Sequence, residues 1–145
     1  MKTNSFISKT DQTLIVKAIE SAEMNTSGEV RVHIESNCPG DSITRAAYVF
    51  NKLKMFKTKE RNGVLIYIAW KAHKFAIIGD TGINKVVPEN FWEDTLALLG
   101  EYLRSDQTTE GLCKTIEMAG DKLKVFFPIK SDDTDEQSNE ISFGD

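Results

Sequence analysis

The sequence of 145 residues has the length of one domain, and its 40% hydrophobic content is sufficient for a core without disulfides or a structural metal. No stretch approaches the roughly 18 consecutive apolar residues of a membrane-spanning helix. The polar start of the chain lacks the apolar block of a signal peptide, so we expect a cytoplasmic protein without membrane insertion. Cys38 and Cys113 have no metal-binding spacing, and we expect them to be idle thiols.

The acidic charge is concentrated at the end of the chain. The net charge is −4, but residues 130–145 contain one lysine and six acidic residues and carry −5, which leaves about +1 for residues 1–129. A segment so polar buries too little apolar surface to offset its ordering entropy, so we expect a disordered acidic tail over residues 130–145. In residues 1–129 basic and acidic residues are interleaved, which gives no reason to expect nucleic acid as a partner.

The first elements in chain order are a helix, a strand and a second helix. Apolar residues recur at three- and four-residue spacing in both helices, whereas the strand alternates strictly between polar and apolar side chains. Capping residues mark both helix starts, Ser8 or Thr10 for the first and Asp41 or Ser42 for the second. The three elements fall at residues 10–24, 29–35 and 42–53.

The next strand, residues 64–69, is apolar on both faces and should be a central strand covered on both sides. Four residues separate it from residues 74–79, which is short enough for a hairpin and makes these strands antiparallel. Phe91 and Trp92 lie on the apolar stripe of a later helix, where core packing is the favoured role. Helices are predicted at residues 83–87, from Pro88 to 103, and from 108 to the stop at Pro128.

These elements predict an α/β fold over residues 1–129, a three-layer α-β-α sandwich with a small mixed sheet of three to five strands between helices. The strands at residues 29–35 and 64–69 should be parallel, joined by a right-handed crossover. An additional edge strand, near residues 6–7 or elsewhere, stays open.

The strand directions bring three polar loops together at one end of this sheet, which we call its polar edge. Two strands start there, and the antiparallel third strand ends there. Arg31, two residues into the first strand, points to the same face as Glu29. The other side chains expected at this edge are two more carboxylates, a guanidinium and an amide, supplied by Glu60, Asp80, Arg61 and Asn62.

Oxygen ligands of this kind suit the hard cations Ca²⁺ and Mg²⁺. We therefore expect a Ca²⁺ (or Mg²⁺) site whose protein ligands are Asp80, Glu29, Glu60 and Asn62. Asp41 lies at the opposite end of the strand at residues 29–35 and should not be a ligand. A structural alternative stays open, in which the glycines and Asp80 serve the turn and Asp80 caps the next helix.

Several catalytic classes lack their sequence signatures. There is no Gly-x-Ser-x-Gly motif of serine hydrolases, no phosphate-binding Gly-x-x-x-x-Gly-Lys loop and no Gly-x-Gly-x-x-Gly dinucleotide motif. His33 and His73 have no metal-ligand spacing, which argues against zinc-dependent hydrolysis.

Three motifs in order and spacing resemble the TPM domain family, and the resemblance covers nearly all of residues 8–128. They are Ser-Gly-Glu-Val-Arg-Val at residues 27–32, Arg-Asn-Gly followed by an apolar strand at 61–68, and Ile-Gly-Asp-Thr-Gly-Ile at 78–83. The resemblance implies an α/β sandwich, binding of divalent cations and of calcium especially, and an acid phosphatase activity. The motif positions are Gly28, Glu29, Arg31, Arg61, Asn62, Gly63, Gly79, Asp80 and Gly82.

Three functions follow from this reading. The first is binding of a divalent metal ion at the polar edge. The second is hydrolysis of a phosphate monoester at the same place, with Asp80, Arg61 and Arg31 as the catalytic residues; it ranks lower because no general base is recognisable. The third is an interaction module that binds a protein partner through the tail or an exposed helix.

Overall fold

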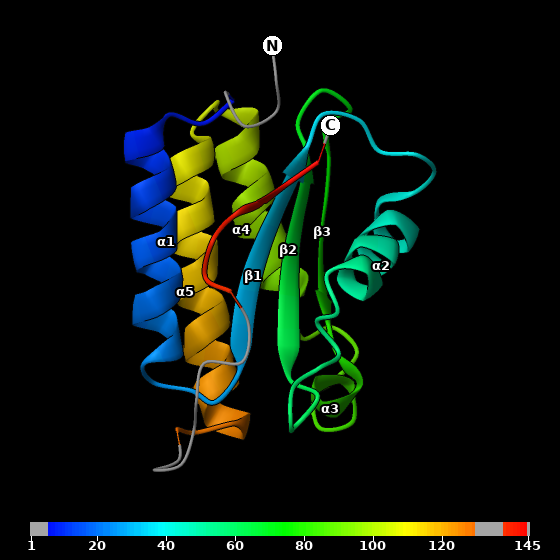
Figure 1. Ribbon diagram of the computed structural model, residues 1–145, viewed down its shortest axis with the longest axis vertical. Helices are drawn as coiled ribbons and strands as arrows, with labels where there is room; N and C mark the ends of the chain where they lie inside the picture. Colours follow the sequence, from blue (N-terminus) through cyan, green and yellow to red (C-terminus); the bar gives the residue numbers. More distant parts are fainter. Residues whose placement is uncertain (1–5, 130–137, 145) are drawn as a thin grey trace.

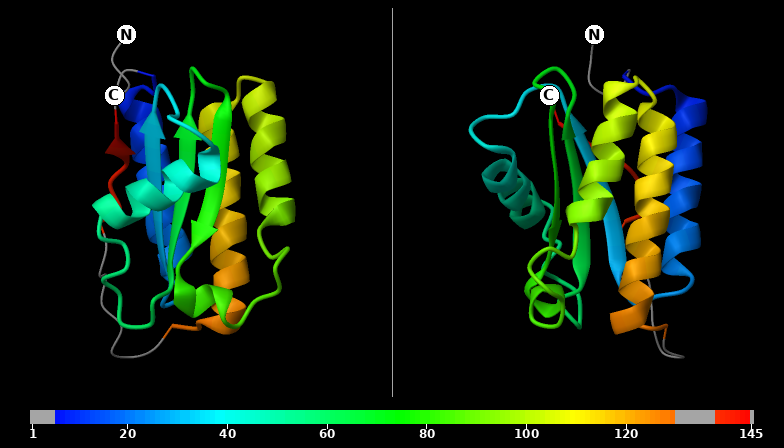
Figure 2. Two further views of the ribbon diagram at one scale, coloured as in Figure 1. Left: turned by 90° about the vertical axis from the view of Figure 1, so that its right-hand side faces the viewer. Right: turned by 180° about the vertical axis from the view of Figure 1, so that it is seen from behind.

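The computed structural model describes residues 6–129 and 138–144, and it confirms the predicted α/β sandwich. Figures 1 and 2 show three layers, with helix α2 on one face of the sheet and helices α1, α4 and α5 on the other. The helices are α1 (Lys9–Glu23), α2 (Ser42–Lys52), α3 (Thr81–Asn84), α4 (Glu93–Arg104) and α5 (Thr108–Phe126). Ser8 caps α1 and Asp41 caps α2, as two of the expected capping residues.

The sheet is mixed and has the strand order β3-β2-β1-β4 in the described residues. Strands β1 and β2 are parallel and joined through α2, whereas the hairpin makes β3 antiparallel to β2, both as predicted. Every residue of β2 is buried, in agreement with its apolar pattern on both faces. The strands are β1 (Glu29–Glu35), β2 (Gly63–Ala69), β3 (Lys74–Gly79) and β4 (Ser142–Phe143).

The two faces of the sheet are covered differently. The side with α1, α4 and α5 holds the larger core, to which β1 contributes its alternate apolar residues Val30, Val32 and Ile34. The side with α2 holds a smaller core built on Leu65 and Tyr67 of β2. Helix α2 packs on β2 and β3. The polar face of β1 therefore lies on the α2 side, beside the smaller core.

Two of the predicted helices have other bounds in the structure. The short helix is Thr81–Asn84 rather than 83–87, because Asp80 caps it and so starts it directly at the end of β3. The following helix starts at Glu93 rather than at Pro88. The residues between form turns instead, in which the N–H of Phe91 donates to Pro88 O and that of Glu93 to Asn90 O. Proline and asparagine both favour such turns.

The end of the chain adds a strand. Of the residues 130–145 for which disorder was expected, 130–137 and 145 lie outside the described residues, whereas 138–144 are described and contain β4. Strand β4 pairs in parallel with the outer edge of β1. Ile141 and Phe143 explain this order, because they pack against the larger core while polar residues alternate between them. No helix in the described part of the chain is long and apolar enough to span a bilayer.

Candidate functional site

The three polar loops meet at one edge of the sheet, as the strand directions predicted. Glu29 lies opposite Gly63 in the β1–β2 register, and Gly79 lies opposite Val64 in the β2–β3 register. Backbone hydrogen bonds join the loops: the N–H of Asp80 donates to Gly63 O at 2.9 Å. Figure 1 shows these loops at the lower end of the sheet, beside α3.

Asp80 is held by Arg61. The Arg61 Nε donates to Asp80 Oδ2 at 2.8 Å and its Nη2 donates to Oδ1 at 3.0 Å, a bidentate pair. The backbone N–H of Thr81 donates to the same Oδ1 at 2.7 Å, so Asp80 also caps α3. The Asp80 side chain is 3% exposed and that of Arg61 is 48% exposed. The carboxylate is therefore fixed, while its partner approaches from solvent.

Asn62 forms the second part of the site. Its Nδ2 donates to Ser27 Oγ at 3.3 Å, and that hydroxyl donates to Glu60 Oε2 at 2.9 Å. The Asn62 Oδ1 is buried and has no hydrogen-bond partner among the described residues. Burying an amide oxygen without a partner costs about 1–3 kcal/mol, so this atom calls for an explanation. Sequence analysis missed Ser27 as the residue that links Asn62 to Glu60, although it stands in the first motif.

The loop that carries these residues is tightly constrained. Arg61 has a positive φ of 51°, unusual for a residue with a side chain. The N–H of Gly82 donates to Arg61 O at 2.8 Å, and a Cβ at Gly82 would lie 2.0 Å from Glu60 O. Glycine is required here because only a bare backbone can come so close. The N–H of Glu29 donates to Asn62 O at 3.3 Å, which ties the loop to β1.

Four of the predicted residues form two neighbouring groups rather than one cluster. Asp80 pairs with Arg61, and Asn62 connects through Ser27 to Glu60. Nowhere in residues 6–129 and 138–144 do three or more His, Cys, Asp or Glu side chains gather as a metal-binding group. Arg31 has a different charged neighbour: the carboxylate that acts on it belongs to Glu140, and its Nε is buried without a hydrogen-bond partner in the described residues. Burial lowers the pKa of Arg31, and Glu140 opposes that shift.

A second polar group lies on the same face of β1, near its other end, and sequence analysis missed it. Glu35 is 1% exposed. Arg45 of α2 donates to its carboxylate at 2.7 and 3.0 Å, and the Tyr67 hydroxyl donates to Oε2. His33 Nε2 lies 3.2 Å from Glu35 Oε1, and its Nδ1 lies 2.9 Å from Ser142 Oγ. The one sequence signal was the row of polar residues on one face of β1.

Burial and hydrogen bonding shift the pKa values of this second group. Burial alone would raise the pKa of Glu35, but the hydrogen bonds from Arg45, Tyr67 and His33 outweigh it and lower this pKa to about 2. Burial lowers the pKa of His33, so its imidazole is neutral near pH 7. The neutral ring donates from Nε2 to the ionised Glu35, which leaves Nδ1 to accept from the Ser142 hydroxyl.

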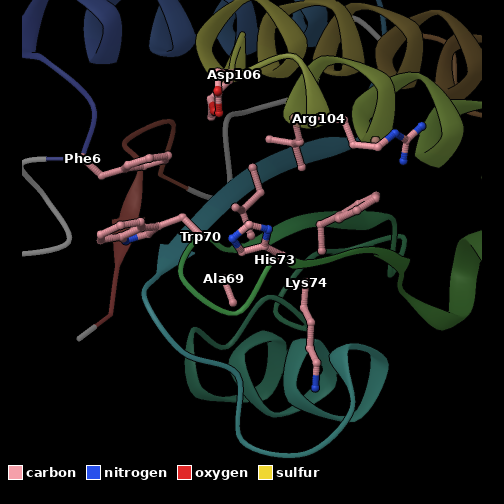
Figure 3. A pocket seen from close by; sticks show the side chains of 12 residues that line it. Phe6, Ala69, Trp70, His73, Lys74, Arg104 and Asp106 are labelled. Carbon is pink, nitrogen blue, oxygen red and sulfur yellow. The ribbon is translucent and has the colours of Figure 1, made fainter.

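The structure also contains a pocket of about 290 Å³ at the hairpin end, away from the polar edge. Phe6 and Trp70 stack at its wall with ring centroids 4.8 Å apart, and His73 and Arg104 lie at its rim (Figure 3). The Lys74 ammonium is directed elsewhere, since it donates to Gly40 O at 2.9 Å. None of the predicted metal or catalytic residues lines this pocket.

A family model of the TPM domain matches residues 1–122. The chain belongs to the TPM domain family. No curated protein matches it. Among solved structures, the NMR structure of BA42 protein from the psychrophilic bacterium Bizionia argentinensis is similar with a TM-score of 0.90 and 45% identity, covering 96% of both chains.

A more distant structural neighbour is the N-terminal domain of the cg2496 protein from Corynebacterium glutamicum, also solved by NMR. It gives a TM-score of 0.65 at 17% identity and covers 81% of this chain and 74% of that one. At this identity the likeness concerns the fold alone. The same fold therefore occurs in a chain that shares few residues with this one.

Proposed function

We propose that this TPM domain binds a divalent cation, Ca²⁺ or Mg²⁺, at the edge where β1 and β2 begin and β3 ends. Its protein ligands would be Asp80, Glu29, Glu60 and Asn62. Hard cations prefer carboxylate and amide oxygens, which these residues supply from three loops already joined by backbone hydrogen bonds. Loop carbonyl groups would complete the oxygen shell.

The observation that carries this proposal is the buried Oδ1 of Asn62. An amide oxygen without a partner among the described residues is unfavourable, and a cation bound there would remove the penalty. The Glu60 carboxylate is connected to the same amide through Ser27. Asn62 therefore presents an oxygen ligand, already buried and oriented, next to a negative charge.

Arg61 supplies the positive charge at Asp80 when no metal ion is bound. A carboxylate with 3% exposure needs a compensating cation, because burying an isolated charge is costly. The Arg61 side chain is half exposed and can move into water at little cost in solvation. A divalent ion would thus compete with the guanidinium for the Asp80 oxygens, and cation binding would release Arg61.

Hydrolysis of a phosphate monoester ranks second. Both Asp80 oxygens accept hydrogen bonds from Arg61, so neither is presented as a nucleophile. The carboxylate that acts on the pKa of Arg31 is that of Glu140 rather than that of Asp80. The two arginines would have to converge before they could neutralise one phosphate group.

An amide-resolved NMR titration with Ca²⁺ and then Mg²⁺ tests the cation proposal. Shifts should be confined to residues 27–31, 60–63 and 79–83, and Asp80→Asn should abolish them. Asp41→Asn is the matched control, since Asp41 also caps a helix and asparagine caps equally well. Equal cation affinity in Asp80→Asn and the wild type, or shifts only in the acidic tail, would refute the site.

A further inference from the structure

Residues 140–144 lie on β1 in a register that pairs their side chains one by one. His33 is opposite Ser142, and their side chains are joined by the 2.9 Å hydrogen bond. Since side chains on one face repeat every two residues, Glu140 falls opposite Arg31 and Gly144 opposite Glu35. The Glu140 charge does act on Arg31, and the Gly144 N–H donates to Ile34 O at 2.9 Å.

The glycine position is the most restrictive of the three. A Cβ at Gly144 would lie 2.7 Å from Glu35 Oε1 and 3.0 Å from His33 Nε2. Both of these side chains are buried and hydrogen-bonded, so neither can give way cheaply. A side chain at this position is therefore incompatible with the docked strand. The intervening residues, Ile141 and Phe143, pack on the larger core.

The surface that receives these residues is built without them. Glu35 is held by Arg45 from α2 and by Tyr67 from β2, and Tyr67 lies in the smaller core. The His33 ring stacks on Tyr67 with ring centroids 6.0 Å apart. Glu35 and His33 are thus held in place by other parts of the domain, which lowers the cost of binding an extended peptide along β1.

Space remains beside the docked strand. A cavity of about 450 Å³ lies between α2 and β4, bounded by His33 and Glu35 on β1 and by Gly144. Lys52 of α2 lines it with a positive charge, whereas the charge of Arg45 is balanced by its pair with Glu35. This cavity gives a peptide room for larger side chains at its open side, and its charge favours acidic ones.

From this geometry we infer that the outer edge of β1 is a peptide-binding groove, and that its partner is an extended segment with the pattern acidic–apolar–serine–apolar–glycine. Such a segment would add a parallel strand to the sheet, where main-chain hydrogen bonds give affinity and alternate side chains give specificity. The chain's own residues 140–144 have this pattern and occupy the groove. The inference does not depend on cation binding.

The internal segment then acts as a competitor. A tethered segment has an effective concentration on the order of millimolar, so a free peptide binds the wild type only when it overcomes that competition. The paired stretch of β4 is two residues long, which makes its release inexpensive. A partner with the same pattern and additional contacts in the cavity would displace it.

The test uses the full-length protein and a fluorescent peptide of residues 138–145. Gly144→Val prevents the internal segment from docking and should bind the peptide roughly tenfold or more tightly than the wild type does. The control Ser131→Val places the same side chain in the same tail, outside residues 138–144, and should behave as the wild type. A peptide with valine in place of Gly144 should not bind, and Arg31→Gln in the Gly144→Val protein should weaken binding severalfold.

Fluorescence anisotropy gives the affinities, and an amide NMR spectrum shows that the Gly144→Val protein keeps its fold in residues 9–126. Absence of peptide binding to this folded variant would overturn the inference, as would equal binding of the peptide that carries valine. If the wild type forms a dimer and the peptide dissociates it, the groove binds a second copy of the chain, and the proposal of a different partner is wrong.

Discussion

Arg61 and Asp80 are joined by two hydrogen bonds, of 2.8 and 3.0 Å, between the loop before β2 and the end of β3. The pair is asymmetric, since the carboxylate is buried and the guanidinium is half exposed. Asp80 is fixed by the cap of α3, whereas the side chain of Arg61 is bonded to this carboxylate and is otherwise half exposed. Another cation could therefore replace the guanidinium of Arg61 at the Asp80 carboxylate.

Arg61→Gln should therefore have opposite effects with and without metal. Without a divalent ion the variant should be less stable than the wild type, because Asp80 stays buried without a counter-charge. With Ca²⁺ its affinity should rise several-fold, because the ion no longer competes with the guanidinium. Isothermal titration calorimetry and thermal unfolding measure the two effects.

Lys57→Gln is the matched control for this variant. It removes the same charge from an exposed side chain in the same loop, where only the general electrostatic field changes. If Lys57→Gln and Arg61→Gln change Ca²⁺ affinity equally, the effect is one of net charge and competition at Asp80 is wrong.

Gly82→Ala should open the polar edge. The added Cβ would lie 2.0 Å from Glu60 O and 2.6 Å from Arg61 O, so the loop before β2 must move away from α3. Such overpacking costs about 1–3 kcal/mol in unfolding free energy, and displacement of Arg61 and Asn62 should also remove cation binding. Urea unfolding and the Ca²⁺ titration check both, with the exposed Lys85→Ala as control. A variant of unchanged stability would contradict the close approach.

The sequence was sufficient to place Glu29, Asn62 and Asp80 at one edge. That result follows from two general rules, the right-handed crossover between parallel strands and the antiparallel hairpin, and needs no side-chain geometry. Which of the side chains pair is a different question. The bidentate contact between Arg61 and Asp80 depends on the left-handed backbone of Arg61, which no spacing of residue types reveals.

The groove on β1 lay beyond sequence analysis for another reason. Ser142 and His33 are 109 residues apart, and a paired stretch of two residues gives no periodic signal above its charged surroundings. The acidic composition of residues 130–145 predicted disorder, although Ile141 and Phe143 provide apolar alternation near the end. The average composition of a long segment hides a pattern as short as this one, although the pairing of β4 with β1 depends on the pattern.

Glu35→Gln should change how stability depends on acid. Hydrogen bonds hold the pKa of Glu35 at about 2, against 4.5 ordinarily, so the folded state binds this proton less readily than the unfolded state. The ionised carboxylate therefore stabilises the fold fully above about pH 4.5, and this stabilisation is lost as the pH falls toward 2. Its size is about 3 kcal/mol.

The variant should be less stable than the wild type at pH 7 and should lose less stability between pH 4.5 and pH 2.5. Urea unfolding followed by circular dichroism at a series of pH values measures this slope. Glu20→Gln, in an exposed position on α1, should leave both stability and slope unchanged. A Glu35→Gln profile parallel to that of the wild type would show that Arg45 and Tyr67 do not favour the ionised form.

Asn62→Leu separates a binding role of the amide from a structural one. Leucine has nearly the shape of asparagine but no oxygen, so it removes the buried, unpaired Oδ1 together with the 3.3 Å bond to Ser27. These losses oppose each other, and without metal the unfolding free energy should change by no more than about 1 kcal/mol. Ca²⁺ at a hundred times its dissociation constant should stabilise the wild type by about 2.7 kcal/mol and the variant hardly at all.

Asn84→Leu, exposed on α3 at the same edge, should keep the full stabilisation by Ca²⁺. If Asn62→Leu destabilises the metal-free protein strongly and still responds to Ca²⁺, then Asn62 supports the loop and the cation binds without it.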